Sequence, residues 1–477
     1  MRSGDVTPRK CTDDITVALR HARMVSFGTA GIRGDVASYL PPETVVQIGR
    51  AISPLGPEVV VGRDARESGE ALVDAIASGL CSGGSDVVRI GQVPTPALAY
   101  ASRERIGVMI TASHNPPSDN GVKVFQDGSE IDRDVERAIE GRCSKEYAPA
   151  DWDSWGGARE DDVLEEYTTA VCEYVETIGE PPQDLTIAID CGNGVGALAT
   201  PSVLHDIGVE TRTVNGRLDG RFPARESAPT PEALDEFRSY VGDGPYDLGF
   251  AHDGDADRLV VIDERGDLVH EDTVLAILAH AYVSTSGCAD PVVLTTPNAS
   301  TRIDERVAAA GGSVERTALG TLHEGIASIE DSVTSPQRRV VFAAEPWKHI
   351  HPDFGPWIDG VASAGVFVRL IAEAGSLDRL REPVTERPYR KESLPCPPHA
   401  AQDVLDTLET ELPTQFPGAS VTTTHGIRVS FPDGGWILVR PSGTEPKIRM
   451  YAEDPDVDTL LGDVREIVEV AIDQAAQ

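Results

Sequence analysis

Short apolar runs alternate with longer amphipathic segments along most of the chain, and glycines separate them in a theme that recurs three times. Each copy reads as strand, helix, strand, helix, strand, with residues 67–80 as the first expected helix. The expected strands are 58–62, 84–91 and 105–110, then 185–190, 208–214 and 246–251, then 291–296, 312–320 and 338–343. Strands alternating with helices predict βαβ units and a largely parallel sheet. The alternative is three unrelated α/β segments.

The chain after residue 382 follows a different pattern. A proline-rich stretch at 387–399 marks a linker, and residues 426–431 and 435–440 read as antiparallel strands around a PDGG turn. We therefore predict an α/β fold of three similar mixed α/β domains plus a smaller α+β C-terminal domain around a central cleft. The predicted boundaries are 1–150, 151–260, 261–382 and 383–477, consistent with ~100–200 residues per domain for a chain of 477.

The polar loop after the third strand of each copy holds the candidate chemistry. These loops are TASHNPPSDNG (111–121), HDGDADR (252–258) and AEPWKHIHPDFG (344–355). Open α/β sheets bind ligands at the carboxyl ends of their strands. Three domains could therefore direct these loops into one cleft.

Asp253, Asp255 and Asp257 occupy alternate positions of the second loop. On an extended loop this spacing turns three carboxylates to one side, a hard-oxygen cage suited to Mg²⁺ or Mn²⁺. An EF-hand also begins D-x-D-x-D, but Arg258 stands at the sixth position where that loop needs glycine. The remaining alternative is a solvated acidic turn.

The first loop places Ser113 and His114 in a turn, with Lys123 at the start of a following strand. A serine hydroxyl is a weak nucleophile unless a base, a metal or prior phosphorylation changes its chemistry. Lys123 is a candidate proton shuttle, because burial lowers the pKa of lysine. The alternative is an ordinary Asn-Pro-Pro turn.

Two further segments suggest anion binding. Residues 440–451 combine hydroxyls, backbone amides around Gly443 and cationic side chains into a possible phosphate cradle; its members are Arg440, Ser442, Gly443, Thr444, Lys447 and Arg449. The alternative is a surface turn. The glycine-rich segment 27–34 with Arg33 is weaker evidence of the same kind.

Residues 191–199 formally fit a dinucleotide fingerprint, but we favour a tight strand-to-helix turn because no acid ends the next strand.

Composition restricts the possible partners. Lys plus Arg is 42 against 78 Asp plus Glu, a net charge of −36 that disfavours nucleic acid and membrane surfaces. Seven scattered cysteines indicate neither a disulfide framework nor a zinc site. No stretch resembles a secretory leader or a membrane span, so we predict a soluble, cytoplasmic protein.

With only six lysines, the acidic surface favours a halophilic-type protein that KCl stabilises, although a merely acidic protein is the alternative.

Taken together and in this order, FGTAGIRG, TASHNPPSDNGVKV, DGDADR and RPSGTEPKIR resemble the α-D-phosphohexomutase superfamily, the group of phosphoglucomutases, phosphomannomutases and phosphoglucosamine mutases. The resemblance spans essentially the whole chain. It implies a Mg²⁺-dependent isomerase that interconverts hexose 1-phosphate and hexose 6-phosphate through a phosphoserine and a hexose 1,6-bisphosphate, which also serves as primer. Sugar phosphates are the implied partners, and the oligomeric state stays open.

The resemblance also implies roles for individual residues. Ser113 corresponds to the phosphoserine, and Asp253, Asp255 and Asp257 with Ser113 to the ligands of one Mg²⁺. Lys123, Arg33 and His114 correspond to the acid/base set. The implied substrate-binding residues are Arg258, Glu345, His349, Arg440, Ser442, Gly443, Thr444 and Arg449.

The sugar-binding loop departs from the family pattern Gly-Glu-x-Ser-Gly-His. Here the run is Ala344 to His349, with Glu345 and His349 at matching places and Trp347 replacing the serine. Sugar preference is therefore open among glucose, mannose and glucosamine, and Asp353 and Asp359 could supplement recognition. Trp347 could instead be a structural plug. Two other functions remain: a metal-assisted sugar phosphatase, and a sugar-phosphate-binding protein without turnover.

Overall fold

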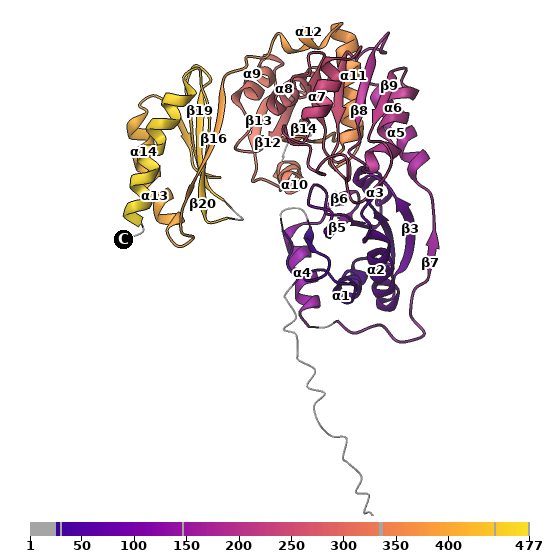
Figure 1. Ribbon diagram of the computed structural model, residues 1–477. Coiled ribbons are helices and arrows are strands. Elements are labelled where there is room, and N and C mark those ends of the chain that lie inside the picture. Colours follow the sequence, from indigo (N-terminus) through magenta and orange to yellow (C-terminus); the bar gives the residue numbers. More distant parts are fainter. Residues whose placement is uncertain (1–24, 29–30, 146, 333–336, 443–444, 476–477) are drawn as a thin grey trace, which may run out of the picture.

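The computed structural model describes residues 25–28, 31–145, 147–332, 337–442 and 445–475. Three α/β domains follow one another along the chain, and a fourth domain lies beside the third (Figure 1). The predicted fold class, three similar mixed α/β domains plus a smaller α+β C-terminal domain, is confirmed. We number the domains I to IV in chain order.

Domain I is built on a seven-stranded sheet of order β1-β5-β4-β2-β3-β7, with β6 paired to β5. Its elements are β1 (Ile32–Asp35), α1 (Pro42–Ile52), η1 (Ser53–Leu55), β2 (Glu58–Arg63), α2 (Gly69–Gly83), β3 (Asp86–Gln92), α3 (Thr95–Ala101), β4 (Ile106–Ile110), β5 (Asp119–Gln126), β6 (Ser129–Glu130), α4 (Arg133–Cys143) and β7 (Ala158–Glu160).

Domains II and III each contain a four-stranded sheet, β11-β10-β8-β9 and β13-β12-β14-β15. The elements of domain II are α5 (Leu164–Glu176), β8 (Thr186–Asp190), η2 (Val195–Leu198), α6 (Thr200–Asp206), β9 (Glu210–Val214), α7 (Asp235–Gly242), β10 (Leu248–Ala251) and β11 (Val260–Asp263). Those of domain III are α8 (Glu271–Thr285), β12 (Asp290–Thr295), α9 (Thr301–Ala309), β13 (Ser313–Arg316), α10 (Leu322–Ser332), β14 (Arg338–Glu345), β15 (Lys348–Ile350), α11 (Gly360–Ala374) and α12 (Leu377–Arg381).

The predicted repetition is confirmed at the level of strand pairing. In each repeat the first strand pairs in parallel with the second and the third, and a fourth strand pairs antiparallel with the third. The first three strands of the repeats are β2, β3, β4, then β8, β9, β10, then β12, β13, β14. The fourth strands are β5, β11 and β15. The functional loop of each copy therefore connects the third strand to the fourth. The predicted domain boundaries stay predictions, and the sheets of domains I and II extend beyond 150 and 260 to include β7 and β11.

One continuous apolar core joins the first three domains. It contains Phe125 of β5, Phe250 of β10 and Phe342 of β14, together with nearly the whole of α11, whose residues 360–371 are all buried. Because these side chains pack into a single cluster, the loops at the carboxyl ends of the strands are held in one arrangement.

Domain IV has a five-stranded antiparallel sheet, β16-β20-β19-β18-β17, backed by two helices with a core of their own. Its elements are β16 (Tyr389–Pro395), α13 (Ala401–Gln415), β17 (Ser420–Thr422), β18 (Ile427–Ser430), β19 (Trp436–Pro441), β20 (Lys447–Glu453) and α14 (Val457–Ala475). A buried ion pair joins it to domain III: Arg302 Nη2 lies 2.6 Å from Glu453 Oε1, and Trp436 Nε1 donates to the other oxygen at 2.8 Å.

Two predictions from composition can be compared with the described residues. The six cysteines among them are all free. No helix in the described ranges is long and apolar enough to span a membrane. The proposed stabilisation by KCl stays a prediction.

We predict that Glu453→Ala destabilises the chain by about 3–5 kcal/mol, because it leaves the Arg302 guanidinium buried without its counter-charge. The free energy of unfolding should be measured in denaturant by the fluorescence of tryptophan. Glu409→Ala, an exposed change on α13, is the control. Equal unfolding midpoints for the two variants would contradict the structural role of the pair.

Candidate active site

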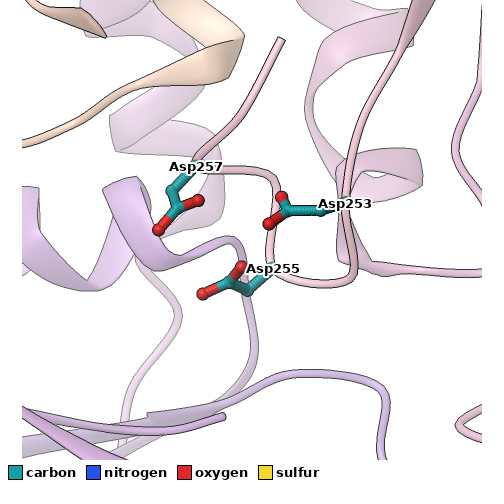
Figure 2. A group of neighbouring side chains, drawn as sticks. All are labelled: Asp253, Asp255 and Asp257. Atoms are coloured by element: carbon teal, nitrogen blue, oxygen red, sulfur yellow. The ribbon is translucent and has the colours of Figure 1, made fainter. Parts of the chain in front are cut away.

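The loop between β10 and β11 presents three aspartates to one another. Side-chain oxygens of Asp253, Asp255 and Asp257 all lie within 4.8 Å of one another, and all three residues are buried. Ala256 within the loop has a φ of +58°, which tightens the turn. Figure 2 shows the three carboxylates projecting from this one loop, with segments of domain I alongside. The solvated acidic turn is therefore excluded.

These residues fit a divalent cation. Asp255 Oδ1 and Asp257 Oδ1 are buried and have no hydrogen-bond partner among the described residues. Burial, and then the charges of Asp257 and Asp255, raise the pKa of Asp253 to about 7. Three buried carboxylates that repel one another, with oxygen atoms unpaired, form the donor set that Mg²⁺ or Mn²⁺ prefers.

Ser113 reaches this loop from domain I. It lies between β4 and β5, and its Oγ donates a hydrogen bond to Asp253 Oδ2 at 2.9 Å. The same hydroxyl lies 3.2 Å from Nδ1 of His114. Ser113 has a φ of +51°, a conformation that costs free energy for a non-glycine residue and requires support from its surroundings. The expected meeting of the first and second loops is thus observed.

Lys123 on β5 faces the same carboxylates. Its Nζ lies 2.8 Å from Asp257 Oδ2 and 3.1 Å from Asp255 Oδ2. Burial lowers the pKa of the ammonium, but these two carboxylates outweigh burial and hold the pKa above its ordinary value. The expectation that burial would lower this pKa is therefore wrong for this arrangement, because Lys123 is the counter-ion of the aspartate group. The same contacts hold the pKa of Asp257 far below its usual range despite burial.

Two arginines and a neutral imidazole complete this part of the site. Arg258 Nε lies 3.5 Å from Asp253 Oδ2 and 4.0 Å from Asp257 Oδ1. Arg33 lies on β1 opposite Gly121 of β5. Burial, followed by the charges of Arg258 and Arg33, lowers the pKa of His114 to about 3. His114 is thus neutral near pH 7, and one ring nitrogen can accept a hydrogen bond.

The loop at 344–349 of domain III, to which the family resemblance gives a role in sugar binding, adjoins this group. Arg258 and Lys348 form an isolated β-bridge, and Leu259 N donates to the carbonyl of Trp347 at 2.9 Å. Glu345 and Lys348 close the β14–β15 hairpin, with Lys348 Nζ 3.2 Å from Glu345 Oε1. Both side chains line a cavity that also includes His323 and Glu130. The expected role of Glu345 in substrate binding stays a prediction, and Lys348 brings a cation that sequence reasoning did not single out.

His349 is not among the residues that line this cavity, and its expected role in sugar recognition stays a prediction. Neighbouring residues of a strand point to opposite faces, so His349 lies on the other side of the hairpin from Lys348. Its Nδ1 is 3.0 Å from Ser363 Oγ of α11, and burial lowers its pKa to about 3. Asp359 is also structural: it caps α11 and accepts a hydrogen bond from Tyr167. Asp353 pairs with Arg339 at the surface.

Trp347 fits the structural alternative. Its φ of +66° is unusual for a bulky residue, and its side chain packs against an apolar cluster of domain II that contains Phe237 and Val260. The tryptophan therefore fixes the sugar-binding loop to the neighbouring domain.

The candidate phosphate cradle of domain IV is separate from these contacts. Arg449 Nη2 pairs with Glu445 Oε2 at 2.8 Å, and Arg440 Nη2 donates to the Tyr451 hydroxyl at 3.1 Å. Ser442 Oγ has no hydrogen-bond partner among the described residues. The hydrogen bonds and ion pairs of Arg440 and Arg449 stay within domain IV, so the structure does not bring them to Ser113. Gly443 and Thr444 lie outside the described residues.

Sequence reasoning missed several residues that support the site. Thr95 Oγ1 donates to Asp255 Oδ2 at 2.7 Å, and Ser227 Oγ donates to the Ser113 carbonyl at 2.7 Å. Arg66, next to the end of β2, donates to the same carbonyl at 2.9 Å. One signal was available: the tetrapeptide Ala-Arg-Glu-Ser occurs at both 65–68 and 224–227.

Family models match most of the chain. Residues 24–149 match the alpha/beta/alpha domain I of the phosphoglucomutase/phosphomannomutase family, residues 165–266 its domain II and residues 401–470 its C-terminal domain. The chain belongs to this family of the α-D-phosphohexomutase superfamily, and hence to a class of isomerases that move a phosphoryl group.

Several curated relatives carry different names. The chain is 40% identical over 440 residues to a phosphopentomutase of Thermococcus kodakarensis, covering 90% of this chain and 94% of that protein. It is 39% identical over 438 residues to a probable phosphoglucosamine mutase of Methanopyrus kandleri, covering 90% and 93%. Among solved structures, a phosphoglucomutase/phosphomannomutase family protein from Burkholderia thailandensis superimposes with a TM-score of 0.82 at 25% identity, covering 95% of this chain and 98% of that one.

We predict that Asp255→Asn weakens the binding of Mn²⁺ or Mg²⁺ on the order of tenfold or more, because it removes one of the three charges that would hold the ion. Titration with Mn²⁺ followed by electron paramagnetic resonance measures binding without turnover. The control is Asp263→Asn, an equally buried aspartate at the opposite end of β11 that pairs with Arg265. Equal Mn²⁺ affinity in the Asp255 and Asp263 variants would contradict the site.

Proposed function

We propose that this protein is a Mg²⁺-dependent phosphohexomutase of the phosphoglucomutase/phosphomannomutase type, with Ser113 as the phosphoryl carrier. The observation that carries the proposal is the position of the Ser113 hydroxyl, 2.9 Å from Asp253 within a buried aspartate group. A divalent cation held by Asp253, Asp255 and Asp257 would offset negative charge on the transferred group. Family membership supports the same chemistry.

The proposed cycle exchanges one phosphate for another. Phospho-Ser113 gives its phosphoryl group to the free hydroxyl of a hexose monophosphate, so that an O–P bond to serine breaks and one to the sugar forms. The resulting hexose 1,6-bisphosphate turns around and returns its other phosphate to Ser113. Such transfer depends on positioning and charge neutralisation more than on covalent chemistry by the protein.

Lys123 is the proposed acceptor of the sugar hydroxyl proton. In the present arrangement it carries a proton because Asp255 and Asp257 contact it directly. If Asp255 and Asp257 held a cation, they would no longer raise the pKa of Lys123, and burial would favour its neutral form. Arg33 and the neutral His114 would donate hydrogen bonds to the phosphoryl oxygens.

The substrate-binding roles divide between two domains. Glu345, and Lys348 beside it, would contact sugar hydroxyls at the β14–β15 hairpin of domain III. Arg258 would contact the reacting group, and Arg440, Ser442 and Arg449, with Gly443 and Thr444, would bind the phosphate that is not reacting. Closure of domain IV over bound substrate would bring this clamp to the sugar, as lids and mobile domains do in other enzymes.

A second candidate substrate is a pentose phosphate. One relative with 40% identity is named phosphopentomutase, and others are named probable phosphoglucosamine mutases. The replacement of the family's Ser-Gly pair by Trp347 and Lys348 in the sugar-binding loop leaves room for such a difference in preference.

We predict that Ser113→Ala abolishes mutase activity and leaves the unfolding midpoint nearly unchanged, because it removes a single hydroxyl. Ser118→Ala, in the same loop but exposed, is the matched control and should retain activity. Turnover should be followed in a coupled assay with Mg²⁺, KCl and a trace of glucose 1,6-bisphosphate. Full activity of the Ser113 variant would refute the carrier role, and release of inorganic phosphate in place of isomerised sugar would favour a phosphatase.

We further predict that at least one hexose 1-phosphate (of glucose, mannose or glucosamine) gives a higher kcat/KM than ribose 1-phosphate, as the proposed phosphohexomutase activity requires. All four should be compared in the same buffer, each with its own bisphosphate primer. A kcat/KM for ribose 1-phosphate that exceeds every hexose value would replace the hexose proposal with the pentose one.

A further inference from the structure

One buried guanidinium holds the loop that carries Ser113. Arg66 is fully buried, and all five of its N–H groups are used. Nε pairs with Asp64 Oδ2 at 3.0 Å, and the other four donate to carbonyls of a single loop: Ser113 at 2.9 Å, Asn115 at 2.7 Å, Pro116 at 2.5 Å and Asp119 at 2.9 Å. The loop is thus wrapped around one side chain.

The partner of Arg66 holds the other side of Ser113. Asp64 Oδ2 accepts a hydrogen bond from Thr111 Oγ1 at 2.6 Å, and Thr111 Oγ1 in turn accepts from the backbone N–H of Ser113 at 2.8 Å. Both backbone polar groups of Ser113 are therefore connected to the same buried ion pair. This connection supports the left-handed conformation of Ser113, whose φ is +51°.

Domain II holds its own functional loop in the same way. Asp190, at the end of the first strand of that domain, pairs with Arg225 Nε at 2.6 Å. Arg225 Nη2 donates to the carbonyl of His252 at 2.6 Å, the residue just before Asp253. Ser227, two residues after Arg225, donates to the Ser113 carbonyl at 2.7 Å and so joins the two loops.

We infer that Arg66 is a positioning residue for phosphoryl transfer, and that Ser227 couples its loop to the aspartate loop of domain II. The inference rests on the proposed function. Arg66 sets where the Ser113 hydroxyl stands, and the Ser227 contact keeps that hydroxyl in register with Asp253. In-line transfer is sensitive to misplacement of the reacting group by about 1 Å, which can cost ~100-fold in rate.

The first test compares Arg66→Lys with Arg369→Lys. Lysine keeps the charge beside Asp64 but has three donors in place of a planar fork. Arg369 is the matched control because it is also buried and donates to the carbonyls of Ile178, Glu176 and Gly179, away from the site. We expect Arg66→Lys to slow single-turnover transfer from phospho-Ser113 to glucose 1-phosphate by about 100-fold, with KM within about twofold of wild type. Arg369→Lys should transfer at the wild-type rate even if it is destabilised to the same extent.

A second pair of variants keeps the inference testable if Arg66→Lys does not fold. Ser227→Ala removes one hydrogen bond to the Ser113 carbonyl, and Ser85→Ala removes equally buried bonds to the carbonyls of Ser53 and Gly56. We expect transfer to slow by about tenfold only in the Ser227 variant. Equal rates within both pairs would overturn the inference while the proposed function stands. A wild-type chain that places no phosphate on Ser113 would overturn both.

Discussion

The structure depends on the confinement of three like charges. Asp253, Asp255 and Asp257 are buried within one turn, where mutual repulsion and desolvation both disfavour ionisation. Two cations offset this repulsion: Lys123 from domain I and Arg258 from the loop itself. Burial and the repulsion that remains hold the pKa of Asp253 above its ordinary value. The balance between the three carboxylates and the two cations beside them is therefore the main physical feature of this site.

The repeated fold brings the compensating groups to the charges. Each of the first three domains pairs its strands in the same order, so each presents a loop at the same edge of its sheet. A shared apolar core fixes these loops relative to one another, and buried Asp–Arg pairs hold two of them by their carbonyls. Domain IV has its own core and is joined to domain III by the buried pair of Arg302 and Glu453.

Patterns of neighbouring residues in the sequence predicted the features that depend on residues close together in the chain. Apolar runs located most of the strands of the repeats, and alternating aspartates in a loop predicted the buried group of three carboxylates. Side-chain direction was harder: His349 matches a family position but lies on the far side of its hairpin, and Asp359 caps a helix. The raised pKa of Lys123 and the role of Arg66 depend on partners 132 or 47 residues away in the chain, which no local pattern contains. Contacts between distant segments were therefore the part that required coordinates.

The most direct measurement is the chemical location of the transferred phosphate. The chain should be incubated with ³²P-labelled glucose 1,6-bisphosphate and Mg²⁺, digested, and mapped by mass spectrometry. The account predicts about one phosphate per chain, on Ser113, which is discharged when glucose 1-phosphate is added. Label on another residue, or sugar isomerisation without any label on Ser113, would contradict it.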